Sequence, residues 1–212
     1  MSILQQIRES LQKGEDAKVA ELTQKAIDDG LGATEILNDG LLAGMDVVGQ
    51  RFGANEIFLP EVLLSARAMN AGMDLIKPLL IEADVPSLGK VVIGTVKGDL
   101  HDIGKNLVGI MLRGAGYEVI DLGADVAADK FVDTAEAEQA NVIGLSALLT
   151  TTMSGMKDVV ELVKSKGLEG KVKVIVGGAP LSQAFADDIG ADGYGYDASN
   201  AVDIVKGLAA AG

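Results

Sequence analysis

The stretch VVIGTVKGDLHDIGKNLV, residues 91–108, decides the fold. It opens with an apolar, β-branched run, passes through a loop that contains glycine, and continues as a helix-like segment. An apolar run without alternation is typical of a strand that is buried on both faces of a parallel sheet. The loop holds His101, the only histidine of the chain, between Asp99 and Asp102. Because ligands bind outside the carboxyl ends of such strands, this loop is the first candidate site.

Four further apolar runs follow at intervals that helix-like segments fill. They are YEVIDLG, NVIGLS, VKVIVGG and DGYGY, at residues 117–123, 141–146, 172–178 and 192–196. Strands that alternate with helices indicate parallel pairing with helices on both faces. The sequence therefore predicts a Rossmann-like, doubly wound, parallel five-stranded sheet over residues 90–212.

Helical periodicity dominates residues 1–80, where we find no convincing strand. Ser2 and Gln5 have the spacing of a capping box, and Pro60 suits a first helical turn. The first expected helix runs from after Ser2 to near Gly14, and the second from near Glu15 to Asp29. The third begins near Thr34, and the fourth runs from near Pro60 to before Pro78. Four helices with short loops predict a bundle, so the fold class is α followed by α/β. Residues 81–89, with Pro86 and Gly89, form the predicted linker.

Composition excludes several classes of protein. The net charge of −13 provides no positive surface for a phosphate backbone, so we expect no nucleic-acid partner. No apolar run reaches the length of about 18 residues that a membrane helix needs, and the first residues do not resemble a signal peptide. The chain has no cysteine, which excludes disulfides, thiolate zinc sites and iron–sulfur clusters. We expect a cytoplasmic protein that binds no membrane.

The loop around His101 fits none of the common phosphate-binding motifs. GDLHDIG is not a G-x-G-x-x-G fingerprint, a P-loop is absent, and Asp99 with Asp102 matches a phospho-receiver site only in part. A lone histidine is often a surface or structural residue, and that interpretation stays open. Alternatively, Asp99 accepts a proton from one ring nitrogen and leaves the other for a metal. One imidazole cannot hold a free ion, but it can be an axial ligand to a metal in a macrocycle.

Three motifs together resemble those of cobalamin-binding domains. Residues 99–104, DLHDIG, match D-x-H-x-x-G; Ser146-Ala-Leu148 matches S-x-L; and Gly177-Gly178 matches the later glycine pair. The intervals are 41 residues (105 through 145) and 28 residues (149 through 176). Residues 37–73 also resemble the helical cap domain of methionine synthase and of small corrinoid methyl-carrier proteins. The resemblance covers nearly the whole chain and is strongest to carriers that consist of these two domains.

The resemblance implies that cobalamin binds base-off/His-on, with His101 as the lower ligand of cobalt. Asp99 would orient and electrostatically tune the imidazole, and Thr152 would continue the chain of hydrogen bonds, although the family often has serine there. Ser146 and Thr150 would hydrogen-bond the displaced benzimidazole tail. The glycines would line its slot, because a β-carbon there would meet the tail. The remaining motif residues complete the expected cofactor-binding set: Asp102, Ile103, Gly104, Leu148, Gly177 and Gly178.

Each of these residues also has an ordinary structural interpretation. VGG after a strand is a common tight turn, and the hydroxyls can cap the following helix. In the helical domain, Phe58, Leu59, Val62 and Met69 are candidates for covering the upper face of the corrin. Apolar residues at helical spacing are equally typical of a bundle core.

For function, the resemblance implies a methyl carrier that is a non-catalytic corrinoid subunit. A substrate-specific methyltransferase would load the methyl group on cobalt, and a second one would pass it to tetrahydrofolate or a thiol. Cobalt would cycle between Co(I) and methyl–Co(III), and a reductive activating protein would be a third partner. We expect a hinge at residues 80–89 that lets the cap move. A cobalamin-dependent regulator or sensor is the alternative, which the acidic N-terminal half disfavours.

Overall fold

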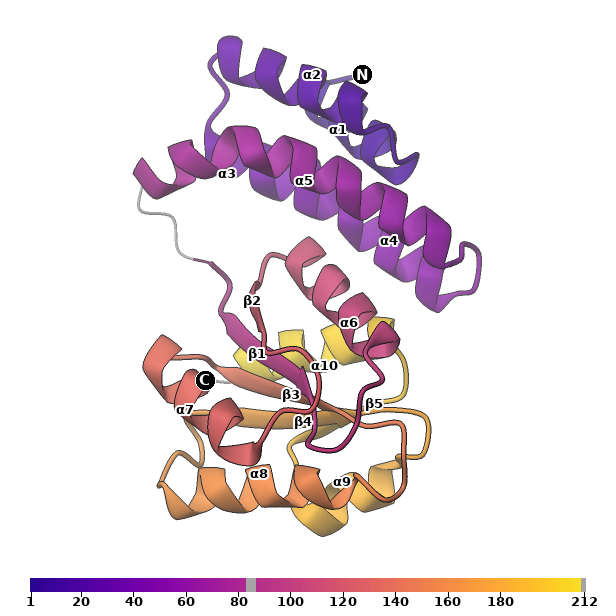
Figure 1. Cartoon of the computed structure of the whole chain (residues 1–212). Coiled ribbons are helices and arrows are strands. Elements are labelled where there is room, and N and C mark those ends of the chain that lie inside the picture. Colours follow the sequence, from indigo (N-terminus) through magenta and orange to yellow (C-terminus); the bar gives the residue numbers. More distant parts are fainter. Residues whose placement is uncertain (83–86, 211–212) are drawn as a thin grey trace. The chain divides into compact units, whose positions relative to one another are not determined.

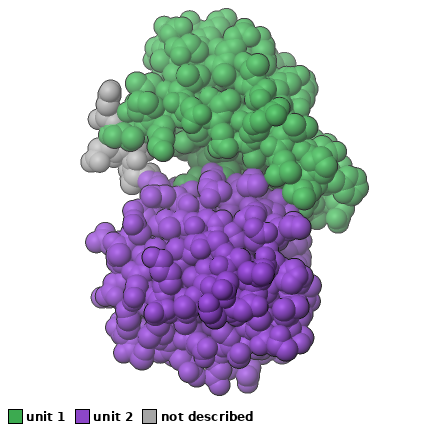
Figure 2. Space-filling model, viewed as in Figure 1, with its two compact units in different colours: residues 1–86, 114–116 green, residues 87–113, 117–212 purple. Residues whose placement is uncertain are grey.

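The structure, a computed structural model, describes residues 1–82 and 87–210. The chain forms two compact units, shown in different colours in Figure 2. One comprises residues 1–86 with 114–116, and the other comprises residues 87–113 with 117–212. Part of the predicted linker and hinge, residues 83–86, lies outside the described residues, so the predicted domain bounds stay a prediction.

The N-terminal unit is helical, as the periodicity predicts. Its elements are α1 (Ile3–Gln12), α2 (Asp16–Asp28), α3 (Ala33–Glu35), the π-helix η1 (Ile36–Leu42), α4 (Ala43–Gly53) and α5 (Leu59–Glu82). The predicted capping box is confirmed, because Ser2 and Gln5 each bind the backbone N–H of the other. The segments α3, η1 and α4 follow one another without a break, so they correspond to one predicted helix. Four helical rods therefore form the bundle.

The predicted end of the fourth helix before Pro78 is wrong, because α5 continues to Glu82. Proline removes one backbone hydrogen bond and costs about 3 kcal/mol in a helix interior. Ile76 and Leu80, four residues apart, are both buried, so the apolar stripe of the helix extends past the proline. Burial of a leucine side chain contributes about 2 kcal/mol, which offsets most of that cost.

The second unit contains the predicted parallel sheet (Figure 1). Its strands are β1 (Lys90–Thr95), β2 (Glu118–Asp121), β3 (Val142–Ser146), β4 (Lys173–Gly177) and β5 (Gly193–Gly195), in the order β2-β1-β3-β4-β5. All four pairings are parallel. The connecting helices are α6 (Ile103–Gly114), α7 (Ala128–Glu138), α8 (Ser154–Ser165), α9 (Gln183–Ile189) and α10 (Ala198–Ala210). The predicted α and α/β fold class is confirmed.

Helices cover both faces of the sheet. Figure 1 shows α7, α8 and α9 on one face and α6 and α10 on the other. The core on the α7 side centres on Phe131, which is fully buried and packs over Gly94 of β1. A β-carbon on Gly94 would lie 2.6 Å from a ring carbon of Phe131, so only glycine permits this close helix–sheet packing. In the described residues, no helix has both the length and the apolar character to cross a membrane.

Candidate functional site

The loops that follow β1 and β3 meet at the carboxyl-terminal end of the sheet. β1 lies between β2 and β3, so the chain order reverses there, which is the position where doubly wound sheets bind ligands. Thr95 and Ser146 are paired at the ends of the two strands. The first loop carries Asp99 and His101, and the second carries Leu148 and Thr152.

Asp99 joins the two loops. Its side chain is fully buried. Oδ2 accepts hydrogen bonds from the backbone N–H of Leu148 (2.8 Å), from that of Leu149 (3.1 Å) and from Thr152 Oγ1 (2.8 Å). Oδ1 accepts the backbone N–H of His101 (3.1 Å) and lies 2.7 Å from Nδ1 of the same residue. Both carboxylate oxygens are therefore committed to the site.

This carboxyl group is ionised despite its burial. Burial alone would raise the pKa of Asp99, but the hydrogen bonds from Leu148, His101 and Thr152 outweigh it and hold the pKa well below the usual range. Hydrogen bonds that stabilise the charged form have this effect, and two of the donors are fixed backbone amides. The site thus contains, at neutral pH, a buried anion next to the only imidazole of the chain.

His101 is oriented by this anion. Since Asp99 is an acceptor only, Nδ1 carries the ring proton, and this assignment leaves the lone pair on Nε2. The imidazole side chain is 51% exposed, so Nε2 is accessible from outside the protein. A histidine whose one nitrogen binds a carboxylate and whose other nitrogen is free has the arrangement of a metal ligand. The predicted pairing of Asp99 with His101 is present in the structure.

Thr152 lies where the predicted chain of hydrogen bonds needs a hydroxyl. Its Oγ1 is 2.8 Å from Asp99 Oδ2 and 2.8 Å from the carbonyl oxygen of Leu149. A hydroxyl has one proton, and the anionic oxygen is the stronger acceptor, so Thr152 donates to Asp99. The side chain is buried. Ser146 is half-buried at the end of β3, and Thr150 is exposed in the loop after it.

The predicted glycines differ in what surrounds them. Gly178 has φ +140°, and a β-carbon there would lie 1.9 Å from the carbonyl oxygen of Ala147, so the protein's own backbone already requires glycine. Gly177 pairs with Ser146 across the sheet. Gly104, in the first turn of α6, has open space around its β-carbon position. Of these three glycines, only the exposed Gly104 is not required by contacts with the rest of the chain.

Apolar side chains surround the imidazole loop and are exposed. Leu100 and Ile103 flank His101 and are 75% and 76% exposed, and Leu148 and Leu149 are also exposed. Exposed apolar residues that gather around a polar centre are typical of a binding surface. A flat group with an apolar face and a central metal fits this surface and the free Nε2. The exposed Asp102 lies within the same loop.

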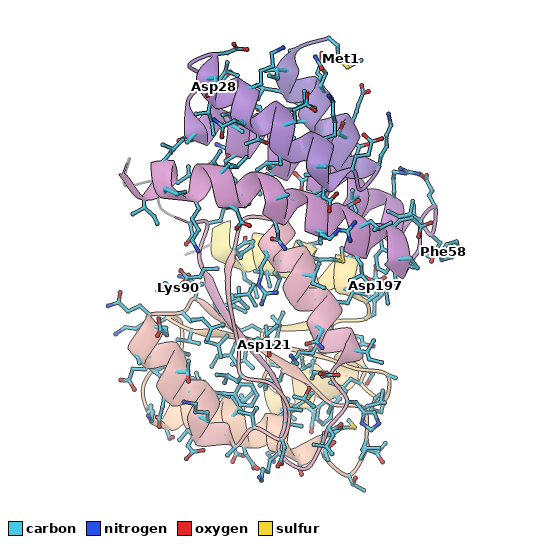
Figure 3. All side chains as sticks on the ribbon, turned by 45° about the horizontal axis from the view of Figure 1, so that its top comes forward. Met1, Asp28, Phe58, Lys90, Asp121 and Asp197 are labelled. Atoms are coloured by element: carbon cyan, nitrogen blue, oxygen red, sulfur yellow. The ribbon has the colours of Figure 1, made fainter. Side chains whose placement is uncertain are left out.

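The candidate residues of the helical unit separate into two groups. Phe58, in the turn between α4 and α5, is 66% exposed, and Figure 3 shows its side chain pointing away from the helices. Leu59 is half-buried. Val62 and Met69 are buried, as members of a bundle core are. Their predicted contact with a corrin stays a prediction.

Sequence reasoning missed three groups that hold the site. Thr95 Oγ1 donates to the carbonyl oxygen of His101 (2.9 Å). Asp125 brackets Asp99, because Asp125 Oδ1 accepts the N–H of Gly98 and the Asp125 N–H donates to the carbonyl oxygen of Asp99.

The third group is an ion pair between the buried Lys105 of α6 and the more exposed Asp121 of β2 (2.6 Å); Figure 3 labels Asp121. The lysine thereby ties the helix after the His101 loop to the neighbouring strand. The available signal was a polar residue within an apolar run, which both Thr95 and Asp121 are.

Comparison with known proteins decides the family. A family model described as a B12 binding domain matches residues 89–203, and a second model of the same description matches residues 3–77. The chain belongs to the B12-binding family. Both units of this B12-binding protein are matched, which confirms the predicted family and the predicted cofactor class, a corrinoid.

Several relatives of this B12-binding protein cover nearly its whole length. A corrinoid protein of Desulfitobacterium hafniense is 45% identical over 209 residues, 97% of each chain. Dimethylamine corrinoid protein 1 of Methanosarcina acetivorans is 50% identical over 181 residues, 85% of each chain.

Two solved structures are similar as well. The methanol:cobalamin methyltransferase complex of Methanosarcina barkeri gives a TM-score of 0.88 at 33% identity, with 99% of this chain and 80% of that chain covered. A cobalamin-binding protein of Desulfitobacterium hafniense gives 0.80 at 31% identity, with 97% and 98% covered.

Proposed function

We propose that this B12-binding protein carries a methyl group on a corrinoid between two methyltransferases. The observation that carries the proposal is the half-exposed His101, held at Nδ1 by the buried anion of Asp99 with Nε2 free. The relatives add support. Proteins named corrinoid protein and dimethylamine corrinoid protein are similar to this chain over most of their length.

The residues of the site would divide the work of holding the cofactor. His101 would supply Nε2 to the cobalt, and Asp99 with Thr152 would keep the ring oriented. Leu100 and Ile103 would pack against the lower face of the macrocycle. Asp102 and Leu148 would complete the contacts around the ring. When bound, the corrinoid would supply a cobalt that accepts and releases a methyl group as it cycles between Co(I) and methyl–Co(III).

The displaced nucleotide base would lie beyond the strand ends. Ser146 and Thr150 would supply hydroxyl groups to it, since a buried ring nitrogen needs a hydrogen-bond partner. The open space at Gly104 would admit the tail, with Gly177 and Gly178 beside the end of β3. In the helical unit, Phe58 and Leu59 are the exposed or half-exposed candidates for covering the reactive face. Val62 and Met69 would support them from within the bundle.

Three partners follow from this role. A substrate-specific methyltransferase would load the methyl group, a second methyltransferase would remove it to tetrahydrofolate or a thiol, and a reductive activating protein would return oxidised cobalt to Co(I). The names of the relatives make dimethylamine the first methyl donor to test. This chain would itself catalyse neither transfer.

A methyl-transfer assay tests the proposal. The protein is reconstituted with hydroxocobalamin, reduced, and incubated with dimethylamine and the dimethylamine methyltransferase of a relative's system. Formation of the methylated cofactor on the wild-type protein, followed by transfer to a thiol when a second methyltransferase is added, is the expected result. A matched variant, His101→Ala, should bind less corrinoid and transfer more slowly. If the loaded wild-type protein accepts no methyl group from methylamine, methanol or methoxyaromatic methyltransferases, the carrier role is wrong.

A further inference from the structure

Thr95 is a buried polar residue to which the proposed function assigns no role. It ends β1, has no exposed surface, and donates from Oγ1 to the carbonyl oxygen of His101 at 2.9 Å. Its backbone is held on the other side, since its N–H donates to Gly123 and its carbonyl oxygen accepts the N–H of Val126. The hydroxyl is therefore attached to a rigid strand, and it reaches into the loop that carries the imidazole.

His101 is consequently held at three points. Asp99 Oδ1 accepts hydrogen bonds from the backbone N–H and from the ring Nδ1–H of His101. The hydroxyl of Thr95 donates to the carbonyl oxygen of His101. Asp99 alone fixes one side of the residue, because both of its contacts come from a single oxygen. The bond from Thr95 fixes the peptide group on the other side of the Cα atom. Two fixed peptide groups determine the direction in which the ring leaves the backbone.

We propose that Thr95 is a positioning residue for the metal ligand: its hydroxyl sets the backbone of His101 so that Nε2 points out of the loop toward the cobalt. The inference rests on the proposed function for the identity of the metal group. The hydrogen bond from the Thr95 hydroxyl to the carbonyl oxygen of His101 exists in the protein without any cofactor. The hydrogen bond of the Thr95 hydroxyl goes to the carbonyl oxygen of His101 and not to the ring, so its effect would pass through the backbone of His101.

Two substitutions separate the hydroxyl from the rest of the side chain. Thr95→Val keeps the shape and the β-branching that suit a buried strand, and it removes only the donor. Thr95→Ser keeps the donor and removes a methyl group. A positioning role predicts that the orientation of the His101 ring is lost in the valine variant and retained in the serine variant. Thr95→Ala provides the same test if the valine variant does not fold.

Thr23 offers a matched control. It is also fully buried, but its hydroxyl has no hydrogen-bond partner among the described residues, and it lies in α2 of the helical unit. Thr23→Val therefore makes the same chemical change at a position without a link to His101. We expect it to leave every signal of the imidazole unchanged.

The first measurement uses the protein without any corrinoid. Because His101 is the only histidine, a protein labelled with ¹⁵N-histidine gives the signals of one ring. At alkaline pH, where an imidazole is neutral, the wild type should show one protonated nitrogen and one with a free lone pair. In Thr95→Val the two ¹⁵N shifts should move toward each other as the tautomers mix, whereas Thr95→Ser and Thr23→Val should match the wild type. Wild-type signals in Thr95→Val, or mixed tautomers in Thr95→Ser, would overturn the inference.

The second measurement adds methylcobinamide, which has no base of its own, and reads from the absorption spectrum the ratio of histidine-ligated to unligated cofactor. Loss of one hydrogen bond should lower this ratio about fivefold in Thr95→Val, with recovery in Thr95→Ser. A wild-type protein that shows no histidine ligation refutes the proposed function, while the ¹⁵N result still decides the role of Thr95. A wild type and a Thr95→Val variant with equal ratios refute the role of Thr95 alone.

Discussion

Oδ1 of Asp99 lies 2.7 Å from Nδ1 of His101, and the other oxygen of the same carboxylate binds two backbone amides of the loop after β3. One buried anion therefore connects the neighbouring loops and orients the ring. Because the amides are fixed by the fold, the orientation exists in the protein alone. Binding of a corrinoid then requires little reorganisation of the lower ligand, which lowers the entropic cost of ligation.

Acid should remove the contribution of Asp99 to stability. The pKa of this carboxyl is lower in the folded protein than the value of about 3.9 for an unfolded aspartate, so the unfolded state takes up the proton first. The stabilisation is complete above that unfolded value and is lost as the pH falls toward the folded pKa.

Urea unfolding of wild type and Asp99→Asn between neutral pH and the acid limit of folding provides the measurement. The difference in unfolding free energy should be constant above about pH 5 and shrink below pH 4, by at most about 1.4 kcal/mol per pH unit. A difference that does not change with pH would show that folding does not lower the pKa of Asp99.

Two glycines of the site should respond to alanine in opposite ways. Gly178→Ala places a β-carbon against the carbonyl oxygen of Ala147 at φ +140°, and should lower the unfolding free energy by at least about 2 kcal/mol. Gly104→Ala meets open space in a helix, and should leave stability unchanged or slightly raise it.

The same Gly104→Ala variant tests the proposed slot for the nucleotide tail. If the tail occupies the open space, the added methyl group should weaken cobalamin binding about tenfold, as overpacking does. Binding of cobinamide, a corrinoid without the tail, serves as the control and should not change. Equal loss for both corrinoids would place the tail elsewhere.

In the Lys105–Asp121 pair, substitution of the aspartate should lower the unfolding free energy more than substitution of the lysine. The lysine side chain is 3% exposed and that of Asp121 is 29% exposed. Asp121→Asn leaves a buried ammonium without a counter-charge and should cost about 3 kcal/mol, whereas Lys105→Met leaves a carboxylate that reaches water and should cost about 1 kcal/mol. Chemical unfolding of the two variants gives both values, and the reverse order would contradict this description of the pair.

Much of the fold could be predicted because its signals are local. Each strand is a short apolar run, and glycine or proline marks the ends of most helices. The helix end at Pro78 was the exception, since burial of Leu80 depends on tertiary packing that a local rule does not include.

The site was predictable only in part, because its motifs name side chains and much of its geometry is backbone. Asp99 and His101 are only two positions apart in the sequence, so their pairing could be expected. The amides of Leu148 and Leu149 reach Asp99 only because β3 lies beside β1 in the sheet. Asp125 brackets Asp99 through a left-handed residue at φ 56°, which no pattern in the sequence indicates. The role of Thr152 could be predicted only from the resemblance to a family, because a threonine at this position by itself indicates no more than a helix cap.

The ligation of cobalt by His101 is the central claim, and electron paramagnetic resonance tests it most directly. The protein is prepared with ¹⁴N- or ¹⁵N-histidine, loaded with cobalamin, and reduced to Co(II), whose unpaired electron couples to the nucleus of its lower ligand. With one histidine in the chain, the label changes a single possible ligand. We predict that each cobalt line is a triplet with ¹⁴N-histidine and becomes a doublet with ¹⁵N-histidine. A triplet in both samples would mean that the cofactor's own base is still bound to cobalt, and would contradict the account.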